Sequence, residues 1–182
     1  MTTASNRWQE ESDVYNTDNS SFRFVLPPKS VVTFTGQVIT EIITPFNDAL
    51  NNFSKSTQSQ NLVIDTTKPN YFNGDAGRAK RVSESDGYVV YQVTDLKGFS
   101  AIVYHHTGVW GGVSFQVSSD GNSWTTLPHE SFNSVYSSMG WYRKNYFNRI
   151  TPPVGTKYLK VLFSGAGAWE KQLADISIAV GP

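Results

Sequence analysis

The sequence predicts an all-β fold of the sandwich or barrel type. From about Leu62 onward, short stretches of alternating apolar and polar residues recur, separated by clusters of Gly, Asn, Asp, Ser or Pro. No long amphipathic helix pattern and no repeat of propeller or solenoid length interrupts them. Aromatic residues make up 14% of the chain and charged residues only 16%. This profile is typical of extracellular all-β domains.

The expected strands follow one another at short intervals. In chain order they cover 62–65, 79–83, 88–94, 99–106, 112–119, 123–128, 157–165 and 173–180. The Asp120-Gly121 pair predicts a hairpin turn between the fifth and sixth strands. Trp124 comes three residues after Gly121, where a large ring normally covers the edge of the core. We therefore expect Trp124 to be structural rather than to contact a ligand.

The N-terminal third is expected to differ from the rest. Residues 21–36 alternate on both sides of Pro27-Pro28 and predict a β-hairpin with one apolar face, which is too small to be stable alone. We expect 1–36 to be the tail of a neighbouring domain and 62–182 to be the sandwich.

Residues 37–61 are expected to be a linker that leads into the domain through a short helical or irregular turn. Phe46, Leu50 and Phe53 lie near a helical spacing in this polar segment. These three apolar residues are expected to anchor the segment to the domain that follows.

Composition excludes several classes of function. The chain has no cysteine, which excludes disulfides and thiolate metal sites. Fifteen basic residues balance fifteen acidic ones, so neither a nucleic acid nor a membrane surface is an expected partner. No apolar run has membrane-spanning length, and the polar start lacks a signal-peptide pattern. We expect the chain to be a piece of a longer polypeptide.

The residues give little sign of catalysis. Of the three histidines, His105 and His106 are adjacent in an expected strand, so their rings point to opposite faces and cannot bind one metal together. No zinc-protease, serine-hydrolase or P-loop motif is present. Glycoside hydrolysis needs two facing carboxylates, and the fifteen acids are scattered, most of them in expected turns. We expect a protein that is not an enzyme, while two carboxylates facing across an aromatic cleft would favour a lyase or hydrolase.

The aromatic residues suggest a binding surface instead. Several lie in or beside expected loops, where exposed rings usually contact something. Trp and Tyr stack on the apolar faces of sugars, while Asn, Asp, Arg and Gln bond their hydroxyl groups. The segment 140–149 combines both kinds of side chain, and Trp110 lies at a glycine-flanked tip. The expected ligand contacts are Trp110, Trp141, Tyr142, Arg143 and Tyr146. The alternative is that these rings only seal the ends of the core.

Three segments resemble a known class of module. They are 115-FQVSSDGNSWTTLP-128, 157-KYLKVLFSG-165 and 168-AWEKQLADISI-178, and they look like the discoidin-like, galactose-binding-like β-sandwich modules. The resemblance covers about 43–181 and implies a jelly-roll β-sandwich, with the hairpin as its N-terminal extension. Trp169, beside an expected loop, is a further candidate contact, although the resemblance places it just before the last strand, where it also suits a structural role.

The same resemblance implies a metal. Such modules often hold a structural calcium ion, and Asp75 and Asp175 lie in the matching opening and closing stretches. Calcium needs six or more oxygen ligands, of which the sequence offers these two carboxylates.

A second resemblance concerns the front of the chain. Residues 2–14 and 22–34 look like the C-terminal tail of a family 30 glycoside hydrolase. The resemblances together imply an extracellular, non-catalytic carbohydrate-binding module. Its expected role is to target an appended polysaccharide-degrading enzyme, the parent glycosidase, to xylan or β-glucan. The alternative is a structural or interaction sandwich that packs on the catalytic domain and binds no sugar.

Overall fold

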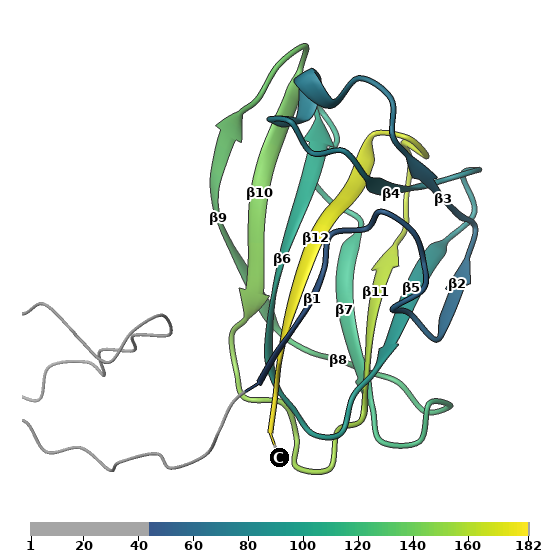
Figure 1. Ribbon diagram of the computed structural model, residues 1–182, viewed down its shortest axis with the longest axis vertical. Coiled ribbons are helices and arrows are strands. Elements are labelled where there is room, and N and C mark those ends of the chain that lie inside the picture. Colours follow the sequence, from purple (N-terminus) through teal and green to yellow (C-terminus); the bar gives the residue numbers. More distant parts are fainter. Residues whose placement is uncertain (1–43, 182) are drawn as a thin grey trace, which may run out of the picture. The chain divides into compact units, whose positions relative to one another are not determined.

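The computed structural model describes residues 44–181 as a sandwich of two antiparallel sheets (Figure 1). The larger sheet, sheet A, has the order β3 (Leu62–Asp65), β4 (Arg78–Arg81), β12 (Lys171–Val180), β6 (Leu96–His106), β10 (Trp141–Asn148) and β9 (His129–Tyr136), with β1 (Thr44–Asp48) also paired to β12. Sheet B has the order β2 (Gln58–Gln60), β5 (Gly87–Gln92), β11 (Tyr158–Phe163), β7 (Val113–Ser118) and β8 (Thr125–Thr126). The prediction of an all-β sandwich is confirmed.

The main core lies between the two sheets. Alternate residues of each strand point inward, so β6 contributes Phe99, Ala101 and Val103. Across the sandwich, the Phe99 ring stacks on that of Phe115 from β7 at 4.2 Å between centroids. These apolar residues are nearly or fully buried. Burial of this extent stabilises the fold without any cysteine.

A second, smaller apolar cluster lies on the outer side of sheet A. It consists of Phe72, Tyr104, Trp141 and Ala174. Phe72 comes from η1 (Pro69–Phe72), a 3-10 turn that begins at a proline and ends at Asn73 in the left-handed conformation. The Tyr104 hydroxyl donates a hydrogen bond to the Phe72 carbonyl at 2.7 Å. This bond holds η1 against the outer face of the sheet.

The segment 44–60 contains two strands where the sequence suggested a linker and a short helical or irregular turn. β1 pairs with β12 and β2 pairs with β5. The three apolar residues do anchor the segment: Leu50 is fully buried, and Phe46 and Phe53 pack against the main core. The near-helical spacing was misleading because the chain bends sharply at Asp48, whose carboxylate accepts the Leu50 N–H at 3.0 Å and the Tyr91 hydroxyl at 3.0 Å.

The sequence also missed β9 and β10. Both lie in a segment that we expected to be loop, yet β10 pairs with β6 on one side and with β9 on the other. The sequence of β10 shows no clean alternation because both of its faces carry aromatic and polar residues. This strand decides where the candidate contact residues point.

Different elements lie at the two ends of the sandwich, along the direction of its strands. In Figure 1, η1 lies at the upper end, and the C-terminus is marked at the lower end. The pairing of Thr44 with Val180 places the start of β1 beside the end of β12. The N-terminal hairpin and the glycosidase-like tail predicted for 1–36 lie outside the described residues. Within the described part, no helix is long and apolar enough to cross a membrane.

Candidate functional site

A pocket with a volume of about 380 Å³ opens beside η1, at the start of β10 and just before β12. This volume lies in the range of roughly 300–1,000 Å³ that is usual for small-molecule sites. Its aromatic lining consists of Tyr71, Phe72, Trp141 and Trp169. Its other lining residues are Asp65, Thr67, Lys68, Lys80, Met139 and Gln172. The pocket therefore combines ring faces with hydrogen-bonding groups.

The two tryptophans of the pocket differ in exposure. Trp141 is 5% exposed and packs against Phe72 at 4.7 Å between ring centroids. Trp169 is 49% exposed and meets Trp141 nearly edge to face at 5.9 Å. The His106 ring contacts both indoles, at 5.3 Å from Trp141 and 5.2 Å from Trp169. Trp141 thus fixes the wall of the pocket, and Trp169 offers the larger surface to a ligand.

The polar wall of the pocket is built around Asp65. Its carboxylate accepts a hydrogen bond from the Lys80 ammonium at 2.6 Å. Burial opposes ionisation of Asp65, but the hydrogen bonds from Lys80 and Thr67 outweigh it and lower the carboxyl pKa to about 2. Lys68 lies over the Tyr71 ring at 5.4 Å. The pocket therefore presents a carboxylate that is ionised at neutral pH and two lysine side chains beside its rings.

The fully buried Arg78 holds the parts of the pocket together. Its guanidinium lies 3.9 Å from the centroid of the Phe72 ring. It donates to the Gln172 side-chain oxygen at 3.0 Å and to the Thr67 carbonyl at 2.6 Å. Gln172 in turn donates to the Trp169 carbonyl at 3.0 Å. One buried cation therefore connects η1, β12 and the loop that carries Trp169.

The candidate contacts Trp110 and Tyr142 lie on the other side of β10. Trp141 pairs with His106 and Tyr142 pairs with His105, and adjacent residues of a strand point to opposite faces. Ring contacts agree, because Tyr142 packs against Trp110 at 5.0 Å between centroids. The prediction that His105 and His106 point to opposite faces is confirmed. Trp141 and Tyr142 consequently belong to different surfaces.

Tyr146 lies in the main core. Its hydroxyl bonds with His105 Nε2 at 2.9 Å, and its ring contacts Phe115 at 5.8 Å. Burial raises the pKa of the Tyr146 hydroxyl to about 12. A buried ring has no free face for a sugar, so we place Tyr146 outside the candidate pocket.

Arg143 is directed to the outer face of sheet A, opposite Tyr104 in the neighbouring strand. It is half-buried and does not line the pocket. Its charge lowers the pKa of Asp175, which burial and the charges of Asp75 and Asp48 raise. Arg143 therefore belongs with the carboxylates that were expected to bind calcium.

The predicted calcium ligands are close enough to influence each other, since the Asp75 charge contributes to the raised pKa of Asp175. The Asp75 carboxylate also accepts a hydrogen bond from the Tyr104 hydroxyl at 2.6 Å. Across 44–181, no group of three or more His, Asp or Glu side chains is arranged to hold a metal ion. The fit to calcium is therefore partial: two carboxylates share a region of sheet A, and further ligands would have to be backbone oxygens or water.

The sequence missed the residues that form most of the pocket. Asp65, Lys80 and Gln172 lie in strands, and Tyr71 and Phe72 lie in a turn that carried no chemical motif. Arg78 begins the strand Arg78–Arg81, in which three of the four residues are basic, so the sequence does not single it out. The partners of Arg78 are up to 94 residues away along the chain. Only the tertiary fold brings these groups together.

Trp124 packs on the outer face of sheet B and not on the edge of the core. Its ring lies under the Lys160 ammonium at 3.7 Å and meets the Tyr158 ring nearly edge to face at 6.4 Å. The turn before it is held by the Asp120 carboxylate, which accepts N–H groups of Asn122 and Ser123 at 2.8 Å each. Trp124 is thus a structural partner of β11.

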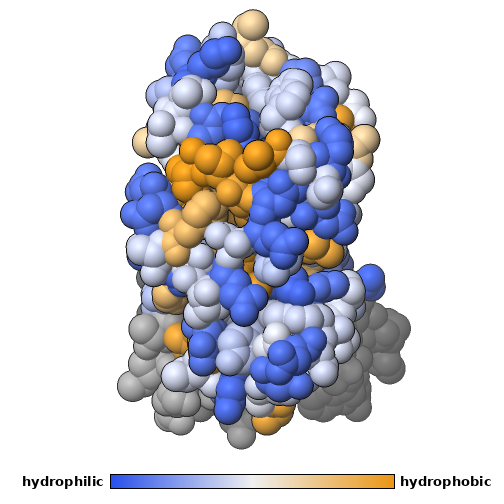
Figure 2. All heavy atoms as spheres, turned by 90° about the vertical axis from the view of Figure 1, so that its right-hand side faces the viewer, coloured by the Kyte–Doolittle hydropathy of each residue, from blue (hydrophilic) through white to orange (hydrophobic). Residues whose placement is uncertain are grey.

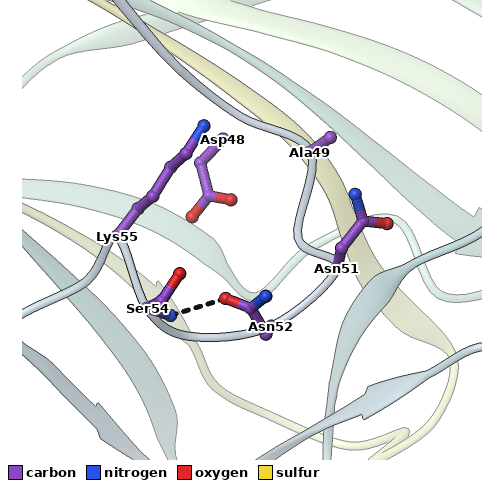
Figure 3. A pocket seen from close by; sticks show the side chains of 6 residues that line it. All are labelled: Asp48, Ala49, Asn51, Asn52, Ser54 and Lys55. Atoms are coloured by element: carbon purple, nitrogen blue, oxygen red, sulfur yellow. Dashed lines mark hydrogen bonds between the residues drawn. The ribbon is translucent and has the colours of Figure 1, made fainter.

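A smaller pocket of about 110 Å³ lies in the loop between β1 and β2 (Figure 3). Its six lining residues are Asp48, Ala49, Asn51, Asn52, Ser54 and Lys55, and none is aromatic. Several of its polar groups are satisfied within the loop. Asn52 accepts the Ser54 N–H at 2.8 Å, and the Lys55 ammonium donates to the Asn47 carbonyl. This pocket offers no ring for stacking.

No protein-family model and no curated protein matches the chain. Several solved structures are similar in fold. A CBM35 module from Paenibacillus barcinonensis is 14% identical with a TM-score of 0.43, over 74% of this chain and 97% of that one. A CBM6 module from Clostridium stercorarium, solved with cellobiose, is 17% identical with a TM-score of 0.45, over 73% and 92%.

A third similar structure is the K1 adhesin domain of Lys-gingipain from Porphyromonas gingivalis. It is 14% identical with a TM-score of 0.45, over 74% of this chain and 97% of that one. None of these similarities assigns a ligand to this chain.

Proposed function

We propose that this chain is a non-catalytic carbohydrate-binding module whose ligand site is the pocket beside η1. The observation that carries the proposal is the half-exposed Trp169 ring, set beside Trp141 and facing a wall of charged and amide side chains. A sugar ring has apolar C–H faces and a rim of hydroxyl groups, which require these two kinds of partner. A sugar ring that enters can stack on the Trp169 indole while its hydroxyl groups bond Asp65 or Lys80.

The position of the pocket suits an accessory module. It lies at the end of the sandwich where β6 ends and β10 and β12 begin, whereas β1 begins and β12 ends at the other end. On this proposal the module acts outside the cell and raises the local concentration of xylan or β-glucan near an appended glycosidase.

The geometry of the pocket does not suggest glycoside hydrolysis. Asp65 is the single carboxylate among its lining residues, and it is ionised and paired with Lys80. Hydrolysis of a glycosidic bond by the common mechanisms needs a second carboxyl group across the site. Binding is therefore the function that this pocket supports best.

Affinity electrophoresis tests the proposal. Gels that contain xylan, β-glucan, mannan or chitosan are expected to retard the wild type on at least one polysaccharide. Trp169→Ala should lose most of the retardation, because removing an aromatic contact at the centre of a site typically costs about 2 kcal/mol or more. Trp124→Ala, the same change on the opposite sheet, is the control and should migrate like the wild type. No retardation of the wild type on any gel would overturn the proposal.

A structural calcium ion near Asp75 and Asp175 is a further part of the proposal. Burial and the charges of Asp75 and Asp48 raise the pKa of the Asp175 carboxyl. A cation bound beside these carboxylates would lower that pKa again. We expect the thermal midpoint to rise by several degrees in excess calcium relative to excess chelator. Equal midpoints would count against the ion, and Asp175→Asn is expected to abolish any difference.

A second candidate function is an interaction module that packs on a neighbouring domain without binding sugar. The observation that favours it is an apolar patch among polar side chains on the side of the molecule shown in Figure 2. Val63 of β3 and Val82 just after β4 are exposed apolar residues at this edge of sheet A. Absence of retardation on every polysaccharide would favour this reading.

A further inference from the structure

Three aromatic side chains form a second ring cluster on the other side of β10: Trp110, Tyr136 and Tyr142. We propose that this second ring cluster is an outer subsite for the same glycan, reached only by chains longer than the pocket can hold. The inference rests on the proposed function of the pocket. It predicts that the module recognises an extended segment of polysaccharide rather than a single sugar or a chain end alone.

The outer two rings of the second ring cluster are exposed, and both contact the ring of Tyr142. Trp110 is 44% exposed and Tyr136 is 57% exposed. Tyr142 lies between them, with its ring centroid 5.0 Å from that of Trp110 and 5.3 Å from that of Tyr136. Both contacts are nearly edge to face, at interplanar angles of 64° and 70°. The two outer rings are therefore not stacked on Tyr142, and about half of each side chain faces solvent.

The rings are held in place before any ligand arrives. Tyr142 is fixed between two strands, because it pairs with His105 of β6 and with Tyr136 of β9. The loop that carries Trp110 is fixed at Val109, whose carbonyl lies 3.0 Å from His105 Nδ1 and whose N–H donates to the His106 carbonyl at 3.0 Å. Rings that are already ordered lose little conformational freedom on binding. Such rings suit weak, repeated contacts with a polymer.

A short turn joins the second ring cluster to the pocket. Residues Ser137–Gly140 connect Tyr136 to Trp141, and Met139 in this turn is 60% exposed and lines the pocket. The Ser137 hydroxyl donates to the Tyr71 carbonyl at 2.7 Å, which ties the turn to η1. Thr107 ties the other side, donating from its N–H and its hydroxyl to the Gly140 carbonyl at 2.8 and 3.0 Å. A glycan that leaves the pocket over Met139 would meet Tyr136 next.

A glycan fits this surface better than a protein partner does. The second ring cluster consists of amphipathic rings, two of them with hydroxyl groups, and the turn 137–140 links it to the pocket through Met139. A protein interface would need a larger buried apolar centre than three rings at the rim of the sheet. The occupant we assign is therefore a further part of the bound chain.

Isothermal titration with xylo-oligosaccharides and cello-oligosaccharides, from the disaccharide to the hexasaccharide, tests the inference. The wild type should bind the hexasaccharide of the preferred series about tenfold or more tightly than the disaccharide. Trp110→Ala and Tyr136→Ala should bind the disaccharide with the affinity of the wild type. They should lose most of the increase in affinity that the wild type shows for longer oligosaccharides. Trp169→Ala should weaken binding at every length.

Phe132→Ala is the matched control, because Phe132 is an exposed ring of β9 on the outer face of sheet A. It should keep the full gain with length, and thermal midpoints check that all variants fold. A wild type that binds the disaccharide but gains nothing with length would overturn the inference and leave the proposed function standing. The inference would also be overturned if both Trp110→Ala and Tyr136→Ala kept the full increase in affinity with oligosaccharide length. No binding at any length on either series, together with no retardation on any polysaccharide gel, would overturn the proposed function itself.

Discussion

Single residues of this protein take different roles according to which face of a strand they occupy. Trp141 and Tyr142 are neighbours in the chain, yet one lines the pocket and the other belongs to the second ring cluster. The sequence singled out Trp110, Trp141, Tyr142 and Trp169 as candidate ligand contacts. It could not divide them into two surfaces, because that division depends on β10 being a strand. Tyr146 shows the limit most clearly, since its ring lies in the main core.

The fold strongly changes the ionisation of His105. Burial lowers its pKa, the nearby charges of Lys144 and Lys171 lower it further, and the hydrogen bond to Val109 opposes them, with a result of about 4. In the unfolded chain the pKa is about 6.5. Between these values the unfolded chain binds more protons than the folded one, so the free energy of unfolding falls as the pH falls.

We therefore expect His105 to cost up to about 3 kcal/mol of stability as the pH is lowered from about 6.5 to about 4. Urea unfolding of the wild type and His105→Gln over this range measures the effect. His129, whose pKa burial also lowers, contributes in both proteins and cancels in the comparison. The stability advantage of the wild type should shrink on acidification. A constant difference between the two proteins across this range would contradict the assignment.

At the scale of elements, every strand that the sequence predicts from Leu62 onward overlaps an observed strand, but the described part of the chain contains four strands that the sequence does not predict. The 62–65 strand was predicted at its observed bounds, and seven further expected strands overlap observed ones. β1, β2, β9 and β10 were missed. Their segments are polar or mixed in character, and it is pairing with stronger neighbours that makes them extended. Tertiary pairing overrides local propensity in such cases.

The loop between β6 and β7 contains one glycine whose position leaves no space for a Cβ, Gly112. Gly112 has a φ of +77°, and a Cβ at this position would lie 2.2 Å from the Ser164 carbonyl oxygen. We expect Gly112→Ala to lower the free energy of unfolding by roughly 1–3 kcal/mol, through strained backbone and steric overlap. Gly111→Ala is the matched control, because a Cβ there would meet nothing within 4 Å. Thermal unfolding of both variants checks this, and equal midpoints would show that the loop tolerates a side chain.

At the scale of the whole molecule, the pocket and the start of β1 lie at opposite ends of the described sandwich. The first described strand begins beside the last residues of β12, while the pocket lies where β10 and β12 begin. The proposed function could be reached from the loop aromatics together with the resemblance of three segments to galactose-binding-like modules. The pocket itself could not, because Arg78 joins groups from η1, β12 and their loops that are distant in sequence.

The central claim is that a glycan binds in the pocket at Trp141 and Trp169. Its most direct test is a titration of the isotope-labelled protein with the polysaccharide fragment that retards it on gels, followed through the indole N–H signals of its five tryptophans. We expect the Trp169 and Trp141 signals to shift with a shared saturation curve, while the Trp124 signal on the opposite sheet stays unchanged. Shifts at Trp124 with none at Trp141 or Trp169 would show that the ligand binds elsewhere and would contradict the account.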